Sequence, residues 1–328
     1  MPLRNPRSGR NPEQLGSCGE RATLAGRSLH HARVRDPAPL PDDLTRGAFD
    51  RAAAERAGLR AGRLRRRDVR RPFHGVQTVQ HLGTLRDRCA AYAVRMKPGQ
   101  SFSHTTAALL LGLPLPAALE EDPDLHVSTV HPAPPPTARG VAGHRLRIEP
   151  EVDDLEGLSV VAPWEAWAQL APLLTVDELI ELGDAVLWRW KDALPHLVAA
   201  ASTPGRIGGA RLRTALKEIR PGCASPGETR VRLLLTRAGV RMPELNASVT
   251  GRRGQELGRP DLLWRAERVT VEYEGDQHRT DRRQFRIDVE RYERFRDDGW
   301  TVVRVTADDL VGPRRQALVR RVQSLLAP

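Results

Sequence analysis

The sequence contains Arg259-Pro260-Asp261-Leu262-Leu263-Trp264 and, four residues later, Val269-Thr270-Val271-Glu272-Tyr273-Glu274-Gly275-Asp276-Gln277-His278. Two apolar-rich runs flank a short polar segment, which predicts a β-hairpin with a four-residue loop. If Trp264 pairs with Val269, the register places Asp261 opposite Glu272, with Cβ atoms roughly 4.5–5.5 Å apart. The strand period of two puts Glu274 on the same face.

This face of the hairpin carries three carboxylates, which repel one another. Their charge must be offset by protonation, by an arginine or by a divalent cation. Carboxylate oxygens are suitable ligands for Mg²⁺, and also for Mn²⁺. The hairpin is therefore a candidate metal site.

The hairpin lies within a longer alternation of predicted elements. We expect helices over residues 226–238, 284–298 and 307–326, and strands over 245–249 and 301–305. A helix, an antiparallel hairpin, a crossover helix and a returning strand predict an α/β sandwich around a small mixed sheet.

The order of the polar residues in this segment resembles the very-short-patch-repair (Vsr)-like endonucleases of the PD-(D/E)XK superfamily. The resemblance covers residues 225–327, a third of the chain, and rests on an acid near a helix start, then Arg259-Pro260-Asp261, Glu272-x-Glu274-Gly275-x-x-His278, Asp288-x-x-Arg291 and Gly299-Trp300-x-Val302-x-Arg304. It implies a restriction-endonuclease-like fold and hydrolysis of phosphodiester bonds in DNA.

The resemblance also implies roles for individual residues. Asp261, Glu272 and the backbone carbonyl of Tyr273 would hold Mg²⁺ or Mn²⁺, and His278 would assist proton transfer. The other interpretation of His278 is a surface histidine in a turn. Glu274 stands where the superfamily usually carries a lysine, which leaves an inactive descendant as an alternative.

Glu228 matches the acid that the family carries on its helix. The run Ser225-Pro226-Gly227-Glu228 is also a capping box, in which Glu228 would only accept from the Ser225 N–H. Asp288 and Arg291, one turn apart, could form an ion pair on a solvated face. Arg291 or Arg304 could instead neutralise the acids or contact phosphate.

The chain is strongly basic, with a net charge of +11 and a pI near 10.7. Up to Gln77 it has 17 Arg against 8 Asp and Glu, so most of the excess lies in the first quarter. This distribution favours a polyanionic partner such as DNA. Codon bias could explain why Arg replaces Lys, but not the imbalance with acids.

The basic segment has the parts of a winged helix-turn-helix over residues 43–82. Helices are expected at 49–57 and 60–69 around Gly58, followed by a strand at 70–76. The alternative is a solvated arginine face on a small helical domain. Residues 1–42 have the composition of a disordered basic arm or an over-extended start. The predicted DNA contacts are Arg60, Arg63, Arg65, Arg66, Arg67, Arg70 and Arg71.

A middle α/β domain is expected over residues 83–204, with a linker before a C-terminal domain at 210–328. Strands are predicted at 125–130, 141–148 and 158–161, and helices at 103–111, with Ser103 as cap, 164–174 and 176–190. Four of its histidines lack metal-ligand spacing, and we interpret them as surface or core side chains: His104, His126, His131 and His144. Cys18, Cys89 and Cys223 are isolated, which argues against a disulfide framework or a structural zinc site.

The N-terminal two-thirds is similar to AbiEi-type antitoxin regulators. The similarity lies in Phe102-Ser103-His104-Thr105-Thr106-Ala107-Ala108, Gly112-Leu113-Pro114 and Val160-Val161-Ala162-Pro163. It implies DNA binding or autoregulation and a partner in a toxin–antitoxin or defence system. The alternative to a nuclease is thus a non-catalytic DNA-binding regulator that carries an inactive nuclease fold.

No stretch approaches 18 uninterrupted apolar residues, and the N-terminus has no apolar signal region. We therefore expect a cytoplasmic protein without a membrane partner.

Overall fold

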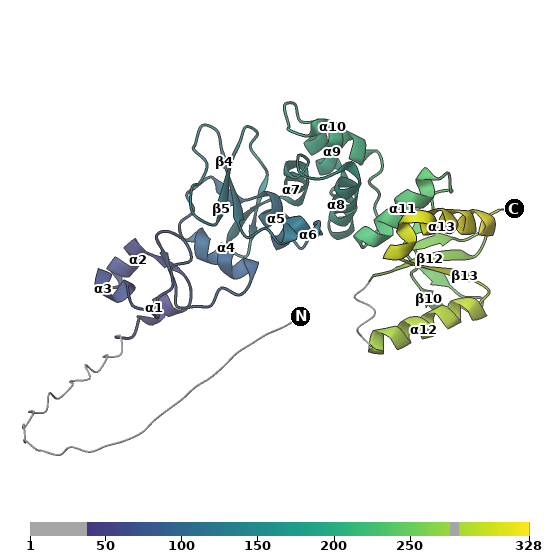
Figure 1. Ribbon diagram of the computed structural model, residues 1–328, viewed down its shortest axis with the longest axis horizontal. Coiled ribbons are helices and arrows are strands. Elements are labelled where there is room, and N and C mark those ends of the chain that lie inside the picture. The colour runs from purple at the N-terminus through teal and green to yellow at the C-terminus, as the bar shows by residue number, and fades with distance from the viewer. Residues whose placement is uncertain (1–37, 276–281, 328) are drawn as a thin grey trace, which may run out of the picture. The chain divides into compact units, whose positions relative to one another are not determined.

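The computed structural model describes residues 38–275 and 282–327, and side chains 282–289 lie outside this description. These residues form a mixed α/β protein with several separate sheets (Figure 1).

The first described region contains three short helices and a two-stranded antiparallel sheet. The helices are α1 (Asp42–Thr45), α2 (Arg51–Arg56) and α3 (Ala61–Leu64), and the strands are β1 (Phe49–Asp50) and β2 (Val76–Gln77). Leu44, Phe49, Ala54, Leu64 and Val69 make a small core between them.

Both helices predicted in this region are shorter than expected. The segment 49–57 opens as a strand, because Asp50 caps α2 by accepting from the Ala53 N–H at 2.7 Å. The segment 60–69 is helical only to Leu64. Its arginines repel one another at helical spacing, and Leu64 and Val69 do not make an apolar helical stripe. A turn follows instead, and its Asp68 pairs with Arg63 of α3.

A five-stranded sheet forms the centre of the next region, in the order β5-β4-β3-β7-β6. Its strands are β3 (Gln100–Phe102), β4 (Leu125–Val130), β5 (Val141–Leu146), β6 (Val152–Leu155) and β7 (Leu158–Val161). The predictions of β4, β5 and β7 are confirmed, with β5 two residues shorter than expected. Strands β3 and β6 were not predicted, because β3 has three residues and β6 is an exposed, acidic edge strand.

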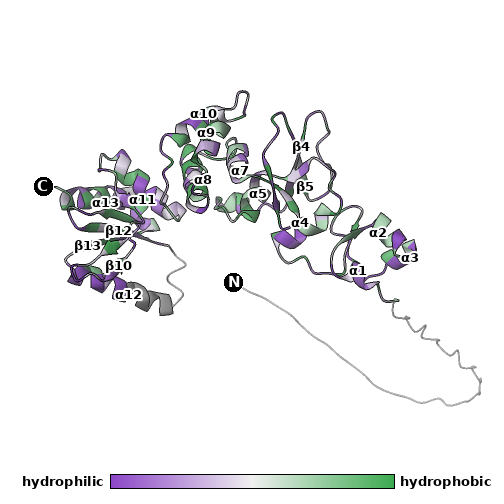
Figure 2. Cartoon of the chain, turned by 180° about the vertical axis from the view of Figure 1, so that it is seen from behind, coloured by the Kyte–Doolittle hydropathy of each residue, from purple (hydrophilic) through white to green (hydrophobic). Residues whose placement is uncertain are grey.

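Helices cover this sheet and continue as a helical layer. The helices are α4 (Leu85–Ala93), α5 (His104–Leu110), α6 (Ala117–Glu120), α7 (Pro163–Gln169), α8 (Val176–Arg189), α9 (Leu194–Ser202) and α10 (Gly209–Leu216). Trp167 is buried among them, and its Nε1–H donates to the Leu179 carbonyl at 2.9 Å. Figure 2 shows α8 as mostly hydrophobic, which fits its position in this core.

The linker predicted after residue 203 does not separate two cores. Helix α10 packs on α8 and α9, and Leu212, Ala215 and Ile219 are buried in the same cluster as Trp167. Gly183 permits this close packing, since a Cβ there would lie 2.3 Å from Cδ1 of Ile219.

The C-terminal sheet has four strands in the order β13-β12-β11-β8. The strands are β8 (Glu244–Leu245), β11 (Leu262–Trp264), β12 (Val269–Glu274) and β13 (Thr301–Thr306), and β9 (Val249–Thr250) pairs separately with β10 (Glu256–Gly258). The predicted register of Trp264 with Val269 is confirmed, as is the return of the chain through a helix to a parallel strand. The single strand expected at 245–249 is divided by Asn246, whose φ is 47°.

Helices lie on both faces of this sheet (Figure 1). Helices α11 (Pro226–Arg237) and α13 (Gly312–Leu325) share one core with it, and α12 (Arg282–Asp297) packs on the other side through Tyr292 and Phe295. The predicted final helix begins at Gly312, after the 3₁₀ turn η2 (Ala307–Leu310).

A buried ion pair joins α11 to α8. Arg232 Nη2 donates to Asp184 Oδ2 at 2.7 Å, and the side chains are only 3% and 0% exposed. Asp184 also accepts from the Thr229 hydroxyl at 2.9 Å and from the Arg220 N–H at 2.8 Å. These bonds compensate the buried carboxylate and fix the helix that begins the C-terminal layer.

Replacing Arg232 with Ala should strongly destabilise the protein, because Asp184 would be left as a buried carboxylate without its cation. Loss of one partner of such a pair costs about 3–5 kcal/mol. Urea denaturation measures the change. The control is Arg241→Ala, which removes an exposed pair with Glu267 and should cost about 1 kcal/mol or less. Equal losses in the two variants would contradict this role for the Asp184 pair.

Candidate active site at the C-terminal hairpin

The hairpin brings Asp261 beside β12. Leu262 pairs with Val271, so Asp261 lies next to Glu272 one step along the ladder. The Tyr273 N–H donates to Asp261 Oδ2 at 2.7 Å, and the Asp261 carbonyl accepts from the Asn246 N–H at 3.0 Å. Glu272 is only 3% exposed. The two acids that the sequence predicts as a pair are therefore neighbours.

Glu228 lies in the first turn of α11 and is 6% exposed. Ser225 caps the helix, as its Oγ accepts from the Glu228 N–H at 3.2 Å. The Glu228 carboxylate does not complete the expected capping box with the Ser225 N–H. It accepts instead from the Ala224 N–H at 2.8 Å and from Asn246 Nδ2 at 2.7 Å. Its side chain is thus held by the segment that also binds Asp261.

Gly227 explains how this helix start reaches the hairpin. A Cβ at Gly227 would lie 2.0 Å from Cε1 of Tyr273, so only glycine allows the Tyr273 ring to pack there. Because Tyr273 lies between Glu272 and Glu274 in β12, this contact fixes the acidic strand against the turn that carries Glu228.

The charges of these acids act on one another. Burial, followed by the charges of Glu228 and Glu272, raises the pKa of Asp261 to about 8. The Tyr273 N–H and Arg291 oppose this shift without cancelling it. Burial also raises the pKa of Glu228, against the bonds from Ala224 and Asn246. Asp261 is therefore mainly protonated at neutral pH when no cation compensates it.

Two arginines compensate the other acids of the hairpin. Arg291 Nη2 donates to Glu272 Oε2 at 2.8 Å. Arg304 binds Glu274 through both Nε and Nη2, the latter at 2.6 Å. The Tyr292 hydroxyl also donates to Glu274, at 3.4 Å, and both guanidinium groups lie 5.3 Å from the centroid of its ring.

Glu274 is therefore held by Arg304 rather than left as an uncompensated third carboxylate. Of the offsets expected from the sequence, the structure contains arginines at the two glutamates, and the raised pKa of Asp261 favours its protonation. Arg291 Nε is buried and has no hydrogen-bond partner among the described residues.

Two residues of the predicted site lie wholly or partly outside the part of the chain that the structure describes. His278 and the side chain of Asp288 are outside it. In the N-terminal region Arg63 pairs with Asp68, and Arg71 Nη2 donates to the Leu64 carbonyl at 2.8 Å. The other predicted DNA contacts are exposed to solvent: Arg60, Arg65, Arg66, Arg67 and Arg70.

The acids of the hairpin do not form a preassembled ligand cluster. Among the described residues, the group of three or more whose ligand atoms lie within 4.8 Å of one another consists of His104, His126 and His144. The interpretation of these histidines as surface or core side chains did not include this proximity of three of them. Their sequence spacing does not show that three different elements bring them together.

Two contacts of the site were missed from the sequence. Asn246 bridges Glu228 to the strand region around Asp261, and Tyr292 packs between two arginines. Asn246 has φ of 47°, which favours Asn among non-glycine residues, but the sequence offers no partner for it. Tyr292 directly follows Arg291 on the same helix, and this adjacency was the signal in the sequence that could have indicated their contact.

Comparison with known proteins identifies relatives without a described activity. The uncharacterised proteins MT2308 and Rv2248 of Mycobacterium tuberculosis, from strains CDC 1551 / Oshkosh and H37Rv, are each 27% identical over 165 residues. The match covers 50% of this chain and 60% of each relative. No family model matches the chain. No solved structure matches it either.

Within the described part of the chain, none of the helices has the length and apolar character needed to cross a membrane.

The raised pKa of Asp261 predicts a pH dependence of stability. The folded state holds a proton on Asp261 up to about pH 8, whereas the unfolded chain releases it near the ordinary value of 3.8. The folded state thus binds more protons between these values, and this group makes stability fall as pH rises from about 4 to about 8.

Urea denaturation of metal-free protein across this range measures the effect. Asp261→Asn removes the titration and keeps an oxygen for the Tyr273 N–H, so its stability should fall less with pH than that of the wild type. Acids that do not interact with Asp261 titrate in both proteins and cancel in the comparison, whereas the coupled Glu228 and Glu272 contribute to the difference together with Asp261. Identical pH profiles would show that Asp261 ionises normally in the folded state.

Proposed function

We propose that the chain is a metal-dependent DNA endonuclease or nickase of the Vsr-like, PD-(D/E)XK type. The observation that carries the proposal is the grouping of Asp261 with Glu272 and Glu228, where burial, followed by the charges of these two glutamates, raises the pKa of Asp261 to about 8. Two buried acids, Glu228 and Glu272, beside the partly buried Asp261 are costly for stability alone. A divalent cation would convert that cost into binding energy.

The donor set suits Mg²⁺ or Mn²⁺. Asp261 and Glu272 offer hard carboxylate oxygens, and the resemblance adds the Tyr273 carbonyl. Bound there, the ion would neutralise phosphate charge and lower the pKa of an attacking water. Glu272 would present its carboxylate oxygens to the ion. Arg291 Nη2 donates to Glu272 Oε2 at 2.8 Å, so the guanidinium lies beside this ligand.

The arginines have a direct use in such a reaction. The buried Nε–H of Arg291, which has no partner in the described part of the chain, is a donor suited to a phosphate oxygen. Arg304 places a guanidinium beside Glu274, where the superfamily usually carries a lysine. A positive charge is thus present near the substituted position, although it is paired with Glu274.

The N-terminal region would supply affinity for DNA. Arg60, Arg65, Arg66, Arg67 and Arg70 are exposed around α3 and the turn that follows it. We propose that this region, with its small sheet β1-β2, acts as the winged helix-turn-helix of an AbiEi-like regulator. A toxin–antitoxin or defence-system partner belongs to the same proposal.

One observation favours a second function. Glu272 and Glu274 are both paired with arginines, and this arrangement would persist in a protein that binds DNA without cutting it. The second candidate is therefore a DNA-binding regulator of antitoxin type in which the nuclease fold is a scaffold.

A plasmid-cleavage assay separates these functions. Incubation with supercoiled or single-stranded DNA should give nicks with Mg²⁺ or Mn²⁺ and none with EDTA, because hydrolysis depends on the ion. Asp261→Ala and Glu272→Ala should reduce cleavage to background while retaining DNA binding in a gel-shift assay.

The matched control is Glu244→Ala, which removes an exposed acid from the same sheet and should cleave like the wild type. If all four proteins bind DNA and none cleaves under any condition, the nuclease proposal fails and the regulator remains.

The basic region makes a separate prediction. Replacing Arg65, Arg66 and Arg67 with Ala should weaken DNA binding and flatten its dependence on salt. Each lost phosphate contact lowers the slope of log K against log salt by about 0.9, so the triple variant should lose about 2.7. Fluorescence anisotropy at several salt concentrations measures this slope.

A second triple variant carries the same change of charge elsewhere. Arg315, Arg320 and Arg321 are exposed on α13, and their replacement with Ala should leave the slope nearly unchanged. Equal effects of the two variants would contradict a specific DNA contact by the turn that follows α3.

A further inference from the structure

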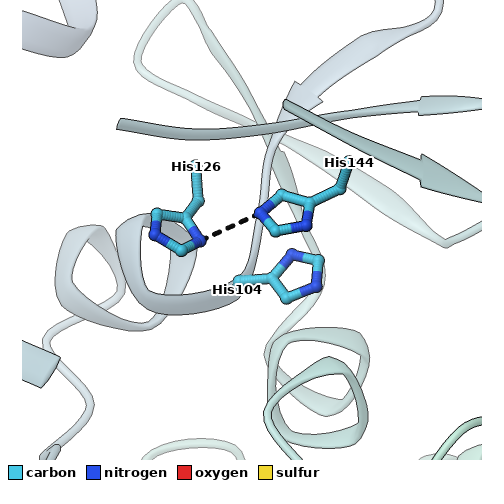
Figure 3. Close-up of side chains that lie close together, drawn as sticks. All are labelled: His104, His126 and His144. Carbon is cyan, nitrogen blue, oxygen red and sulfur yellow. Dashed lines mark hydrogen bonds between the residues drawn. The ribbon is translucent and has the colours of Figure 1, made fainter. Parts of the chain in front are cut away.

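Three histidines from three elements meet beside the five-stranded sheet (Figure 3). His126 lies in β4, His144 in the neighbouring parallel strand β5, and His104 is the first residue of α5. In the register, His126 is opposite Ala142, and His144 is opposite Ser128, so the two histidines are diagonal neighbours on one face.

The start of α5 is held over these strands by hydrogen bonds. The Ser103 N–H donates to the His126 carbonyl at 3.0 Å, and the His126 N–H donates to the Thr106 hydroxyl at 2.7 Å. His104 has φ of 51°, a conformation that costs free energy for a residue with a side chain. Its N–H donates to Gln169 Oε1 at 3.1 Å, which helps to hold that conformation.

The three rings present nitrogen atoms to one another. His144 Nε2 lies 3.0 Å from His126 Nδ1, and one ligand nitrogen from each ring lies within 4.8 Å of the other two. The His104 and His144 rings are stacked, with centroids 3.8 Å apart. The three rings therefore bring nitrogen atoms, and not only carbon atoms, close to one another.

Outer partners select the nitrogen that each ring can offer. His126 Nε2 is 3.0 Å from Asp122 Oδ2, which leaves Nδ1 facing His144. His104 Nδ1 is 3.0 Å from the Ser103 hydroxyl, which leaves Nε2 for a ligand. Ser103 stands at the N-cap of α5 but makes no capping bond, so the predicted cap is replaced by this contact. A carboxylate or hydroxyl behind an imidazole is the usual support of a metal-binding histidine.

Burial lowers the pKa of two of the three rings, those of His104 and His144. Burial, followed by the charges of His144 and His126, lowers the pKa of His104 to about 3. Burial, followed by the charge of His126, lowers the pKa of His144 to about 4. Both rings are neutral at pH 7, so each retains a nitrogen lone pair.

We propose that His104, His126 and His144 form a binding site for a zinc-class transition-metal ion. Imidazole donors favour such ions over Mg²⁺ or Ca²⁺. Zn–N bonds of about 2.0–2.1 Å in a tetrahedral site separate the nitrogen atoms by about 3.4 Å. The His126–His144 nitrogen separation of 3.0 Å is close to that value, and the separations from the His104 nitrogen are at most 4.8 Å.

Occupation of the site requires one adjustment. The His104 and His144 ring planes are inclined by only 19°, so their lone pairs lie in nearly parallel planes and do not converge on one point between the rings. Rotation of the His104 ring would direct its Nε2 toward the other two nitrogens. Three protein ligands leave a fourth position for water or another ligand. This site uses none of the hairpin acids and does not depend on the proposed nuclease function.

Metal titration of the full chain tests the proposal. Metal-free wild type is titrated with Zn²⁺ by calorimetry and with Co²⁺ by visible absorption, which reports tetrahedral coordination. We expect one equivalent bound with the Co²⁺ bands of a tetrahedral site, and a rise in melting temperature with Zn²⁺. Absence of these bands from wild-type protein would overturn the proposal without any variant.

His104→Ala and His144→Gln should each lose this equivalent, whereas Asp122→Asn should weaken it about 10- to 100-fold by removing a supporting partner. His131→Ala is the matched control, since His131 is exposed between β4 and β5. The double variant Asp261→Asn/Glu272→Gln should retain the site, which separates it from the hairpin acids. Unchanged Zn²⁺ binding in folded His104→Ala and His144→Gln would place the ion elsewhere and refute the assignment.

Discussion

The buried pair of Asp184 and Arg232 fixes helix α11, on which the arrangement of the candidate active site depends. Asp184 is 0% exposed and compensated by three donors, so α11 cannot shift without leaving charge uncompensated in the core. Thr229 is the first residue of α11 that bonds to Asp184. Two residues before it, Gly227 leaves room for the Tyr273 ring, which the Cβ of any other residue would block. One short helix thus connects the helical layer to β12, and Glu228 lies between its two fixed contacts.

The distribution of protons and arginines in the hairpin follows from the same restraint. Glu272 receives a guanidinium from Arg291, whereas the Asp261 carboxyl group receives only the Tyr273 N–H among the residues that the structure describes. A single amide dipole compensates a carboxylate less than a full positive charge does, so the excess negative charge is relieved by protonation of Asp261. A cation placed between the two acids would reverse this preference, because Asp261 would then be stabilised in its charged form. The state of Asp261 is therefore linked to whatever positive charge occupies this face.

The sequence was informative where a property is set by neighbouring residues along the chain. The polar loop between Trp264 and Val269 determines the hairpin register, and that register alone predicts Asp261 beside Glu272. The run of arginines after Arg60 was misleading, since helix propensity could not reveal that Arg63 would pair with Asp68 in a turn. Contacts that depend on tertiary structure were not predictable. Asn246 meets Glu228 only after α11 and β8 are in place. The three histidines come together only when β4 and β5 pair in parallel and α5 begins at φ of 51°.

Donor chemistry distinguishes the two candidate metal sites of this chain. The hairpin presents carboxylate oxygens, which bind hard ions weakly unless phosphate oxygens or waters complete the shell. The histidine cluster presents neutral nitrogens supported by Asp122 and Ser103, and such a set binds borderline ions without a substrate. An ion at the hairpin would therefore accompany the substrate, whereas an ion at the histidines would remain with the folded protein. Because the two sites share no residue, each can be filled or emptied while the other keeps its ligands.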